Sequence, residues 1–327
     1  MKTPIGFELL SYNNTRDDLL KYREQGALRG KYLGFPMLDE HYSMALGSCT
    51  DWTGSPSSGK TEFLLECLLN TAKFHQWKHL LYVPDIGNKN QIISKLLHKI
   101  TGKTFDKRYI NSNYITEVEI ENNLHWVLEH FRIIIKKDLK TKITPYQLWD
   151  YATELKNEMH GELHTVTIDS WKDMKRYVDR DGNGIARDDL YLEDVLGYRN
   201  DLLDHYDLHM HTIIHPLKTE KDKNGKRMAP GPYDLKGGTT WYDAGKTIIT
   251  THRQDGTPNG VDISIMKAKP ESVAKMGVVP MCFDKSKLLY YWKNHLNESV
   301  YADPVYKKPI ALQINNNGEE EDDSLPF

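Results

Sequence analysis

The sequence predicts an α/β fold: a mostly parallel central sheet with helices on both faces and a β-hairpin toward its C-terminal end. Short runs of aliphatic and β-branched residues alternate with helical stretches, as they do in parallel sheets. The middle runs lack the polar–apolar alternation of a sheet with one solvated face, which indicates strands buried on both faces. A glycine-rich segment separates the first run from the first long helix, and the end of the chain is rich in strand patterns.

The expected elements follow one another in a regular order. Strands are predicted at 46–52, 79–83, 131–135, 163–169, 210–215, 246–251 and 260–266, with a closing hairpin at 277–293. Helices are predicted near 61–75, 89–101, 116–130, 144–160 and 192–207. Two long polar segments, 171–191 and 216–240, interrupt this order, and each follows a predicted strand end. Such loops are usually functional or disordered, and open α/β sheets place binding residues at strand ends.

The chain of 327 residues is long enough for one large α/β domain, which we place at 36–300. Residues 1–35 are polar and contain one helical stretch at 15–25, so they form either a frayed leader or a linker arm that packs on a neighbouring subunit. Residues 301–327 turn acidic and are expected to be disordered. Their apolar end, Leu325-Pro326-Phe327, favours docking on a partner protein over a purely solubilising role.

The composition argues against several classes of protein. No apolar run approaches membrane-spanning length, and the N-terminus lacks the apolar region of a signal peptide. Cys49, Cys67 and Cys282 contain no CxxC pair, which argues against a disulfide framework or a zinc site and suits a reducing cytoplasm. The net charge of -3 gives no overall basic signature, so a nucleic-acid partner would have to be met by a local patch.

The segment from Gly54 to Thr61 reads G-x-x-x-x-G-K-T, which predicts a phosphate-binding P-loop between the first strand and its helix. The glycines let the backbone turn its N–H groups toward phosphate oxygens, and the helix adds its positive N-terminal end. Lys60 brings a charge to the β- and γ-phosphates, and the Thr61 hydroxyl is a ligand for Mg²⁺. The predicted nucleotide-binding residues are Gly54, Ser55, Pro56, Ser57, Ser58, Gly59, Lys60, Thr61 and Glu62.

Three further side chains at predicted strand ends complete the candidate site. Asp169 follows four β-branched residues and would hold Mg²⁺ through a water molecule. Asp85 follows the next strand after the P-loop and is the candidate to orient the attacking water, although a turn aspartate fits its Pro-Asp-Ile-Gly context equally well. His215 ends another strand, where it could hydrogen-bond the γ-phosphate and pass the nucleotide state to the next loop.

Basic side chains in the two long loops are candidates for nucleic-acid contact. In a monomer these loops would only be solvated, whereas several copies around a strand of DNA would surround it with phosphate contacts. The candidate DNA-binding residues are Lys172, Lys175, Arg176, Lys218, Lys221, Lys223, Lys236, Gly237 and Gly238.

Taken in this order, the motifs resemble the RecA-like motor domain of ring-forming replicative helicases of the DnaB type, especially phage-encoded ones. The resemblance covers about residues 35–295. Gly54–Thr61 resembles the first motif of that family, and the strand that ends at Asp169 resembles its Walker B strand. Asp85 falls where the family has its catalytic carboxylate, which is usually glutamate. Asp85 is one methylene shorter, and this difference could leave a slower ATPase.

The remaining matches concern DNA and the neighbouring subunit. Residues 213–218 resemble the motif whose polar residue senses the γ-phosphate, and 232–241 resemble the motif at the DNA-facing loop. Lys267 and Lys269 fall where the family has K-x-R, a pair that reaches into the ATP site of a neighbour. The lysine at 269 keeps the positive charge of the family's arginine but loses its planar fork.

The resemblance implies an ATP-dependent replicative DNA helicase or translocase that uses ATP and Mg²⁺, acts on single-stranded DNA and works as a homo-oligomeric ring such as a hexamer. It also implies a replication partner for the acidic tail and a place in the cytoplasm, that of the host if the protein is phage-encoded. Three alternatives stay open from the residues. They are a RecA/RadA-type recombinase or recombination mediator that forms filaments, a P-loop kinase of another class, and a nucleotide-dependent scaffold without unwinding activity.

Overall fold

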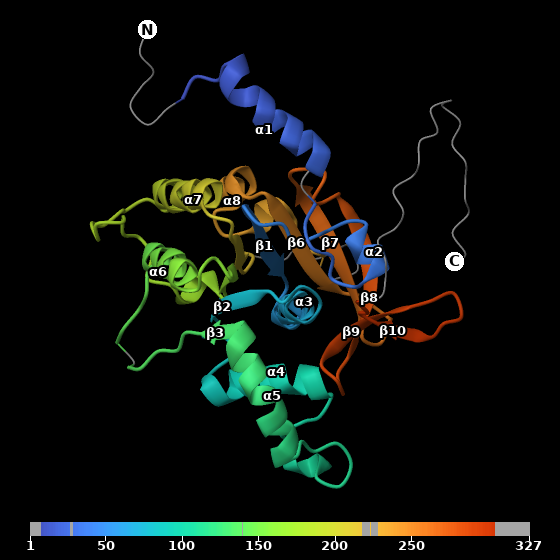
Figure 1. Ribbon diagram of the computed structural model, residues 1–327. Helices are drawn as coiled ribbons and strands as arrows, with labels where there is room; N and C mark the ends of the chain where they lie inside the picture. The colour runs from blue at the N-terminus through green and yellow to red at the C-terminus, as the bar shows by residue number, and fades with distance from the viewer. Residues whose placement is uncertain (1–7, 27–28, 139, 218–222, 224–227, 305–327) are drawn as a thin grey trace, which may run out of the picture.

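One sheet runs through the molecule, and the other elements are arranged around it (Figure 1). The computed structural model describes residues 8–26, 29–138, 140–217, 223 and 228–304. In these residues the sheet has ten strands in the order β10-β9-β8-β7-β6-β1-β5-β4-β2-β3. The strands are β1 Ser48–Gly54, β2 Lys78–Tyr82, β3 Phe131–Ile133, β4 Leu163–Ile168, β5 His209–Ile213, β6 Thr247–Arg253, β7 Gly260–Ala268, β8 Gly277–Asp284, β9 Leu289–Lys293 and β10 Ser299–Tyr301. Neighbouring strands pair in parallel from β3 across to β6 and antiparallel from β6 across to β10, which confirms the predicted fold class.

Helices cover both faces of the parallel part of the sheet (Figure 1). They are α1 Tyr12–Gln25, α2 Pro36–Asp39, α3 Lys60–His75, α4 Lys89–Thr101, α5 Glu117–His130, α6 Pro145–Glu158, α7 Asp188–His205 and α8 Gly238–Ala244. Polar caps fix several predicted helix starts, because Asn88, Thr116 and Thr144 accept backbone N–H groups in the first turns of α4, α5 and α6. None of the helices in the described ranges is both long and apolar enough to span a bilayer.

The main departure from the predicted elements is α8, which lies at the end of the segment expected to be a loop. Its first residue, Gly238, and the residue before it, Gly237, are both glycines. Because glycine is a poor helix former, the sequence of α8 gives little helical signal. Packing explains why it forms nonetheless, since Trp241 is fully buried in the core. Strand β10, which follows the predicted closing hairpin, also lacked a recognisable pattern.

Two apolar cores lie on opposite faces of the sheet. One is formed under α3, α4 and α5 and includes Trp52 of β1 and Phe63 of α3, whose rings are 5.9 Å apart. The other lies under α6, α7 and α8 and includes Trp149 and Trp241. Strand β1 is buried along its whole length, because it contributes to both cores. Truncating such an aromatic side chain typically costs about 3–5 kcal/mol, so the β1–α3 unit is firmly anchored.

The register of the parallel strands brings several strand ends to one edge of the sheet. In β1 and β5, Trp52 lies opposite Ile213, and in β4 and β2, Ile168 lies opposite Tyr82. The segments that follow these strands therefore leave the sheet close together. Strand β1 lies between β5 and β6: the connection that follows β1 leads to β2 on one side of it, and the connection that follows β5 leads to β6 on the other side. Open α/β sheets bind ligands at this kind of position.

The two predicted terminal segments differ in how much the structure describes. Helix α1 lies apart from the rest of the molecule in Figure 1, and its side chains Leu19, Leu20 and Tyr22 are exposed. Of the predicted tail 301–327, residues 305–327 lie outside the described residues. The choice between a leader and a subunit-binding arm therefore remains a prediction.

Candidate nucleotide-binding site

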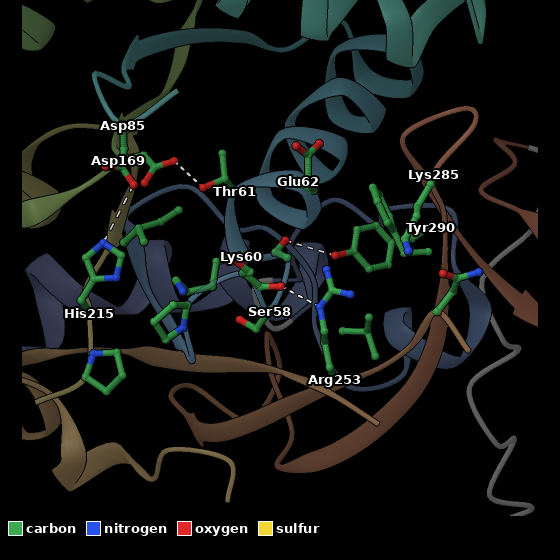
Figure 2. Close-up of a pocket in the computed structure, with 18 of the residues that line it drawn as sticks. Ser58, Lys60, Thr61, Glu62, Asp85, Asp169, His215, Arg253, Lys285 and Tyr290 are labelled. Carbon is green, nitrogen blue, oxygen red and sulfur yellow. Dashed lines mark hydrogen bonds and ion pairs between the residues drawn. The ribbon is translucent and has the colours of Figure 1, made fainter. Parts of the chain in front are cut away.

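The predicted P-loop joins β1 to α3 and lines a cavity of about 800 Å³ (Figure 2). Gly54 has a φ of 145° and Gly59 a φ of 101°, which are backbone conformations that side chains disfavour. A Cβ atom on Gly54 would lie 2.4 Å from the carbonyl oxygen of Thr251, and one on Gly59 would lie 2.2 Å from the hydroxyl of Tyr290. Both positions therefore require glycine, for conformational and for steric reasons.

Lys60 places its ammonium group inside the loop. Its Nζ donates hydrogen bonds to the carbonyl oxygens of Gly54, at 2.9 Å, and of Ser55, at 3.0 Å. The side chain is buried, and burial lowers the pKa of Lys60, whereas the nearby Asp169 and Asp85 raise it. An ammonium group has three donors, so a cation with two carbonyl partners can still bind an anionic oxygen in the cavity.

Thr61 and Asp169 meet at the edge of the cavity. The Thr61 hydroxyl donates a hydrogen bond of 2.7 Å to Asp169 Oδ2 (Figure 2). Burial raises the pKa of Asp169 to about 6, and the hydrogen bond from Thr61 opposes this rise. The other oxygen, Oδ1, is buried and has no hydrogen-bond partner among the described residues. A hydroxyl and a carboxylate with one unused oxygen are the oxygen donors that a hard cation such as Mg²⁺ prefers.

Asp85 lies beside Asp169, with its carboxylate between two basic groups. Its Oδ1 is 2.7 Å from Lys172 Nζ. Its Oδ2 is 4.0 Å from His215 Nε2 (Figure 2). The backbone N–H of Asp85 donates to the carbonyl oxygen of Asp169 at 3.3 Å. Burial lowers the pKa of His215, and Lys60 and Lys172 lower it further, so its ring is neutral at neutral pH.

Lys172 was predicted as a DNA contact, but the structure places it on the wall of this cavity. A short 3-10 turn, Trp171–Asp173, begins two residues after Asp169 and directs the Lys172 side chain toward Asp85. This turn has no sequence signal strong enough to predict that direction. Lys172 therefore lies next to Asp85, the candidate to orient the attacking water.

Glu62 faces lysines of α4. The carboxylate of Glu62 forms an ion pair with Lys95, and its other oxygen lies 3.1 Å from Lys99 Nζ. Burial raises the pKa of Glu62, but Lys99 and Lys95 outweigh it, so the pKa is lowered overall. Because both lysines hold this carboxylate, the predicted contact of Glu62 with nucleotide has no geometric support beyond its place on the cavity wall.

The far wall of the cavity comes from the antiparallel strands, and none of its residues was predicted from the sequence. Arg253 of β6 donates through Nε to the carbonyl oxygen of Ser57 at 2.7 Å. Tyr290 of β9 donates through its hydroxyl to the carbonyl oxygen of Gly59 at 3.1 Å (Figure 2). Phe283 packs against Tyr290 with ring centroids 4.9 Å apart. The wall therefore has an aromatic part, in which Tyr290 contacts the P-loop, and a cationic part, in which Arg253 contacts the P-loop.

Lys267 and Lys269 lie away from the P-loop of their own chain. In the sheet, Ala268 pairs with Thr247, which pairs with Thr50 of β1, four residues before Gly54. At a rise of about 3.3 Å per residue, this separation is about 13 Å along the strands. Lys269 is exposed beyond the end of β7, whereas Lys267 is buried and bonded to α8 of its own chain.

The other predicted DNA-binding residues lie on loops outside the cavity. Lys175 is exposed, and Arg176 lies 5.4 Å from the ring centroid of Tyr177. Lys223 and Lys236 are exposed, whereas Gly237 and Gly238 are partly buried at the start of α8. Lys218 and Lys221 lie outside the described residues.

Comparison with known proteins supports the fold. No model of a protein family matches the chain. The Twinkle homolog protein, chloroplastic/mitochondrial, of Arabidopsis thaliana is 24% identical over 287 residues, which are 85% of this chain and 39% of that protein. The chain therefore spans about two fifths of the length of this curated relative.

Two solved structures have similar folds. One is an ATPase domain, which superposes with a TM-score of 0.69 at 16% identity, over 86% of this chain and 99% of that one. The other is a DnaB-like replicative helicase, described together with its interactions with primase, and it superposes with a TM-score of 0.66 at 15% identity, over 86% of this chain and 68% of that one. The chain thus has the fold of the DnaB-like, RecA-like ATPase domains.

Proposed function

We propose that this chain is the motor of a ring-forming replicative DNA helicase, which couples ATP hydrolysis at subunit interfaces to movement on single-stranded DNA. The observation that carries the proposal is the hydrogen bond between Thr61 and Asp169 next to the buried Lys60. It joins the P-loop to the end of β4 in the way that P-loop ATPases hold a metal-bound triphosphate. The likeness to a DnaB-like replicative helicase favours a motor over other P-loop enzymes.

The residues of the site fit ATP with Mg²⁺. Thr61 and Asp169 would hold the ion, with water and phosphate oxygens completing its shell, because Mg²⁺ usually keeps several waters. Bound Mg²⁺ supplies neutralisation of the charge on the β- and γ-phosphates. Lys60 would donate its third N–H to a phosphate oxygen, which is favourable because the ammonium is buried and partly desolvated.

Asp85 would orient the water that attacks the γ-phosphate. Its ion pair with Lys172 fixes one carboxylate oxygen and leaves the other on the side of His215. The buried Nε2 of His215 has no hydrogen-bond partner among the described residues, so it is available to the γ-phosphate. Because aspartate is shorter than glutamate, the attacking water must lie closer to Asp85 or be reached through a second water.

The site of one subunit would be completed by Lys269 of the next. Lys269 is exposed and about 13 Å along the strands from its own P-loop, which argues that it serves a different subunit. Head-to-tail contacts of this kind form a closed ring when the rotations between successive subunits add up to a full turn. We propose a hexamer, with α1 as the arm that packs on the neighbour.

Single-stranded DNA would bind to the exposed basic residues of the two loops, including Lys175, Lys223 and Lys236. The acidic tail would bind a replication partner through its apolar end, Leu325-Pro326-Phe327. We place the protein in the cytoplasm, that of a host cell if it is encoded by a phage.

The test is ATPase activity with and without single-stranded DNA, for the wild type and for Lys60→Ala. We expect the wild type to hydrolyse ATP faster with DNA and the variant to lose activity in both conditions. Activity that survives in the variant contradicts the assigned site. Images of the wild type with ATP and DNA separate closed rings from the helical filaments of a recombinase.

A further inference from the structure

Lys267 caps the C-terminal end of α8. Its Nζ donates to the carbonyl oxygen of Tyr242 and, at 3.3 Å, to that of Asp243. The same atom lies 4.7 Å from the ring centroid of Tyr242. The last carbonyls of a helix lack partners within the helix and carry partial negative charge. A lysine at this place therefore satisfies both the hydrogen bonds and the helix dipole of α8.

A β-bulge turns Lys267 toward α8. The pairing of β7 with β6 shifts between Ile248 and Ile249, so that Lys267 and Ile265 pair with adjacent residues of β6. Ile265 belongs to the core under α3, whereas Lys267 contacts α8 on the opposite face. Without the bulge, residues two apart in a strand would share a face. Bulges are frequent where a side chain must be re-aimed near a functional site.

The surroundings of Lys267 tie α8 rigidly to β1. Asp51 of β1 and Arg199 of α7 form a fully buried ion pair at 2.7 Å. The guanidinium of Arg199 lies 5.7 Å from the ring centroid of Trp241 in α8. At the end of α8, a Cβ atom on Gly245 would lie 2.8 Å from Asp51 Oδ2. Because the backbone approaches the buried carboxylate this closely, α8 and β1 leave little room for independent movement.

The other end of α8 adjoins the predicted DNA contacts. The helix begins directly after Lys236 and Gly237, and the indole N–H of Trp241 donates to the carbonyl oxygen of Lys236 at 3.1 Å. On the other side of Lys267, Lys269 follows after one residue. Lys267 thus lies between the element that would touch DNA and the residue that would reach the neighbour's ATP.

We infer that Lys267 is a positioning residue that couples α8 to Lys269, so that DNA contact at the start of α8 sets the position of Lys269 in the neighbouring ATP site. This inference rests on the proposed function. It differs from the role that the family resemblance implies, in which the first lysine of the pair itself contacts the neighbour's nucleotide. The buried contacts of Lys267 with α8 would have to break for that role.

The experiment compares ATPase rates with and without single-stranded DNA for Lys267→Met, Lys267→Gln and Lys269→Ala in the full chain. The methionine removes the donor at similar length, whereas the glutamine amide keeps an N–H donor for the α8 carbonyls without a charge. We expect the stimulation by DNA, taken as the ratio of the two rates, to fall about fivefold or more in Lys267→Met. Glutamine should restore most of this ratio. Lys269→Ala should lower both rates together.

Three results would overturn the inference. Equal loss of both rates in both Lys267 variants, as in Lys269→Ala, would mean that the charge of Lys267 acts on the nucleotide. A wild-type ratio in Lys267→Met would mean that no coupling passes through it. A wild type that hydrolyses ATP without any stimulation by DNA would overturn the proposed helicase function as well, which separates the two failures. If the methionine variant does not fold, Lys267→Ala takes its place, because alanine also removes the donor and its ratio decides between the same outcomes.

Discussion

Replacing Asp169 by asparagine should stabilise the fold while it removes Mg²⁺-dependent nucleotide binding. Asp169 is 1% exposed, and burial raises its pKa from 3.8 to about 6. A carboxyl whose pKa is higher in the folded chain binds its proton more tightly there than in the unfolded chain. The wild-type fold therefore loses stability from this group as the pH rises from about 4 to about 6, and the loss is complete above that range.

The size of this loss follows from the two pKa values. The interval from 3.8 to about 6, at about 1.36 kcal/mol for each pH unit, corresponds to about 3 kcal/mol at neutral pH. Asparagine at this position avoids the loss because it has no charge to desolvate. The amide of asparagine would place a buried polar atom without a partner where Asp169 Oδ1 now lies. This lowers the gain in the free energy of unfolding by about 1 kcal/mol. We therefore expect Asp169→Asn to add about 2 kcal/mol to the free energy of unfolding at neutral pH.

The assay is thermal unfolding of the wild type and Asp169→Asn at two pH values, with binding of fluorescent ATP in Mg²⁺ as the functional readout. At about pH 8 the variant should have a Tm higher by roughly 3 °C, and at about pH 5 the difference should be roughly a third as large. Asp85→Asn is the matched control, since this carboxylate is 37% exposed and paired with Lys172, so its loss should not raise the Tm. A Tm of Asp169→Asn that is equal to or below that of the wild type at pH 8 would refute the reasoning.

Three further predictions concern other parts of the site. Lys99→Met should raise the KM for ATP more than it lowers kcat, because Lys99 holds the carbonyl oxygen of Leu288 next to Tyr290 on the far wall; a change in kcat alone would contradict this. Asp85→Glu should raise kcat severalfold if reach limits hydrolysis, and steady-state rates that fall instead would show that the shorter side chain is matched to this site. Arg199→Met should lower the free energy of unfolding by about 3–5 kcal/mol in urea denaturation, because it leaves a buried carboxylate unpaired; a loss below about 1 kcal/mol would show that water reaches it.

Local chemistry made much of the fold and the P-loop predictable from the sequence. Gly54 and Gly59 are required by their positive φ angles and by close neighbours, so the spacing of the two glycines predicts the geometry of the loop. Asp169 was predictable because a β-branched strand ends immediately before it, and the structure places it in hydrogen-bond contact with Thr61. The strand patterns succeeded for the same reason, since strands buried on both faces must be apolar throughout.

Features that depend on distant parts of the chain were not predictable. Arg253 and Tyr290 reach the P-loop only because the antiparallel strands fold back beside β1, and neither belongs to a local motif. Lys172 turns into the cavity through a single turn of 3-10 helix after β4. For Lys267, one shifted pair in the β6–β7 ladder decides which face of the sheet the side chain occupies, and sequence spacing does not reveal such a shift.

Subunit mixing tests most directly whether each P-loop is completed by a neighbour. Lys60→Ala subunits lack a working P-loop but keep Lys269, and Lys269→Ala subunits have the opposite defect. Each should be nearly inactive alone, while an equal mixture should regain roughly a quarter of wild-type ATPase activity, because about one interface in four then pairs an intact P-loop with an intact Lys269. The control mixes Lys269→Ala with a chain that carries both substitutions, and it should stay inactive. A mixture of the two single variants that is no more active than this control would contradict the shared site.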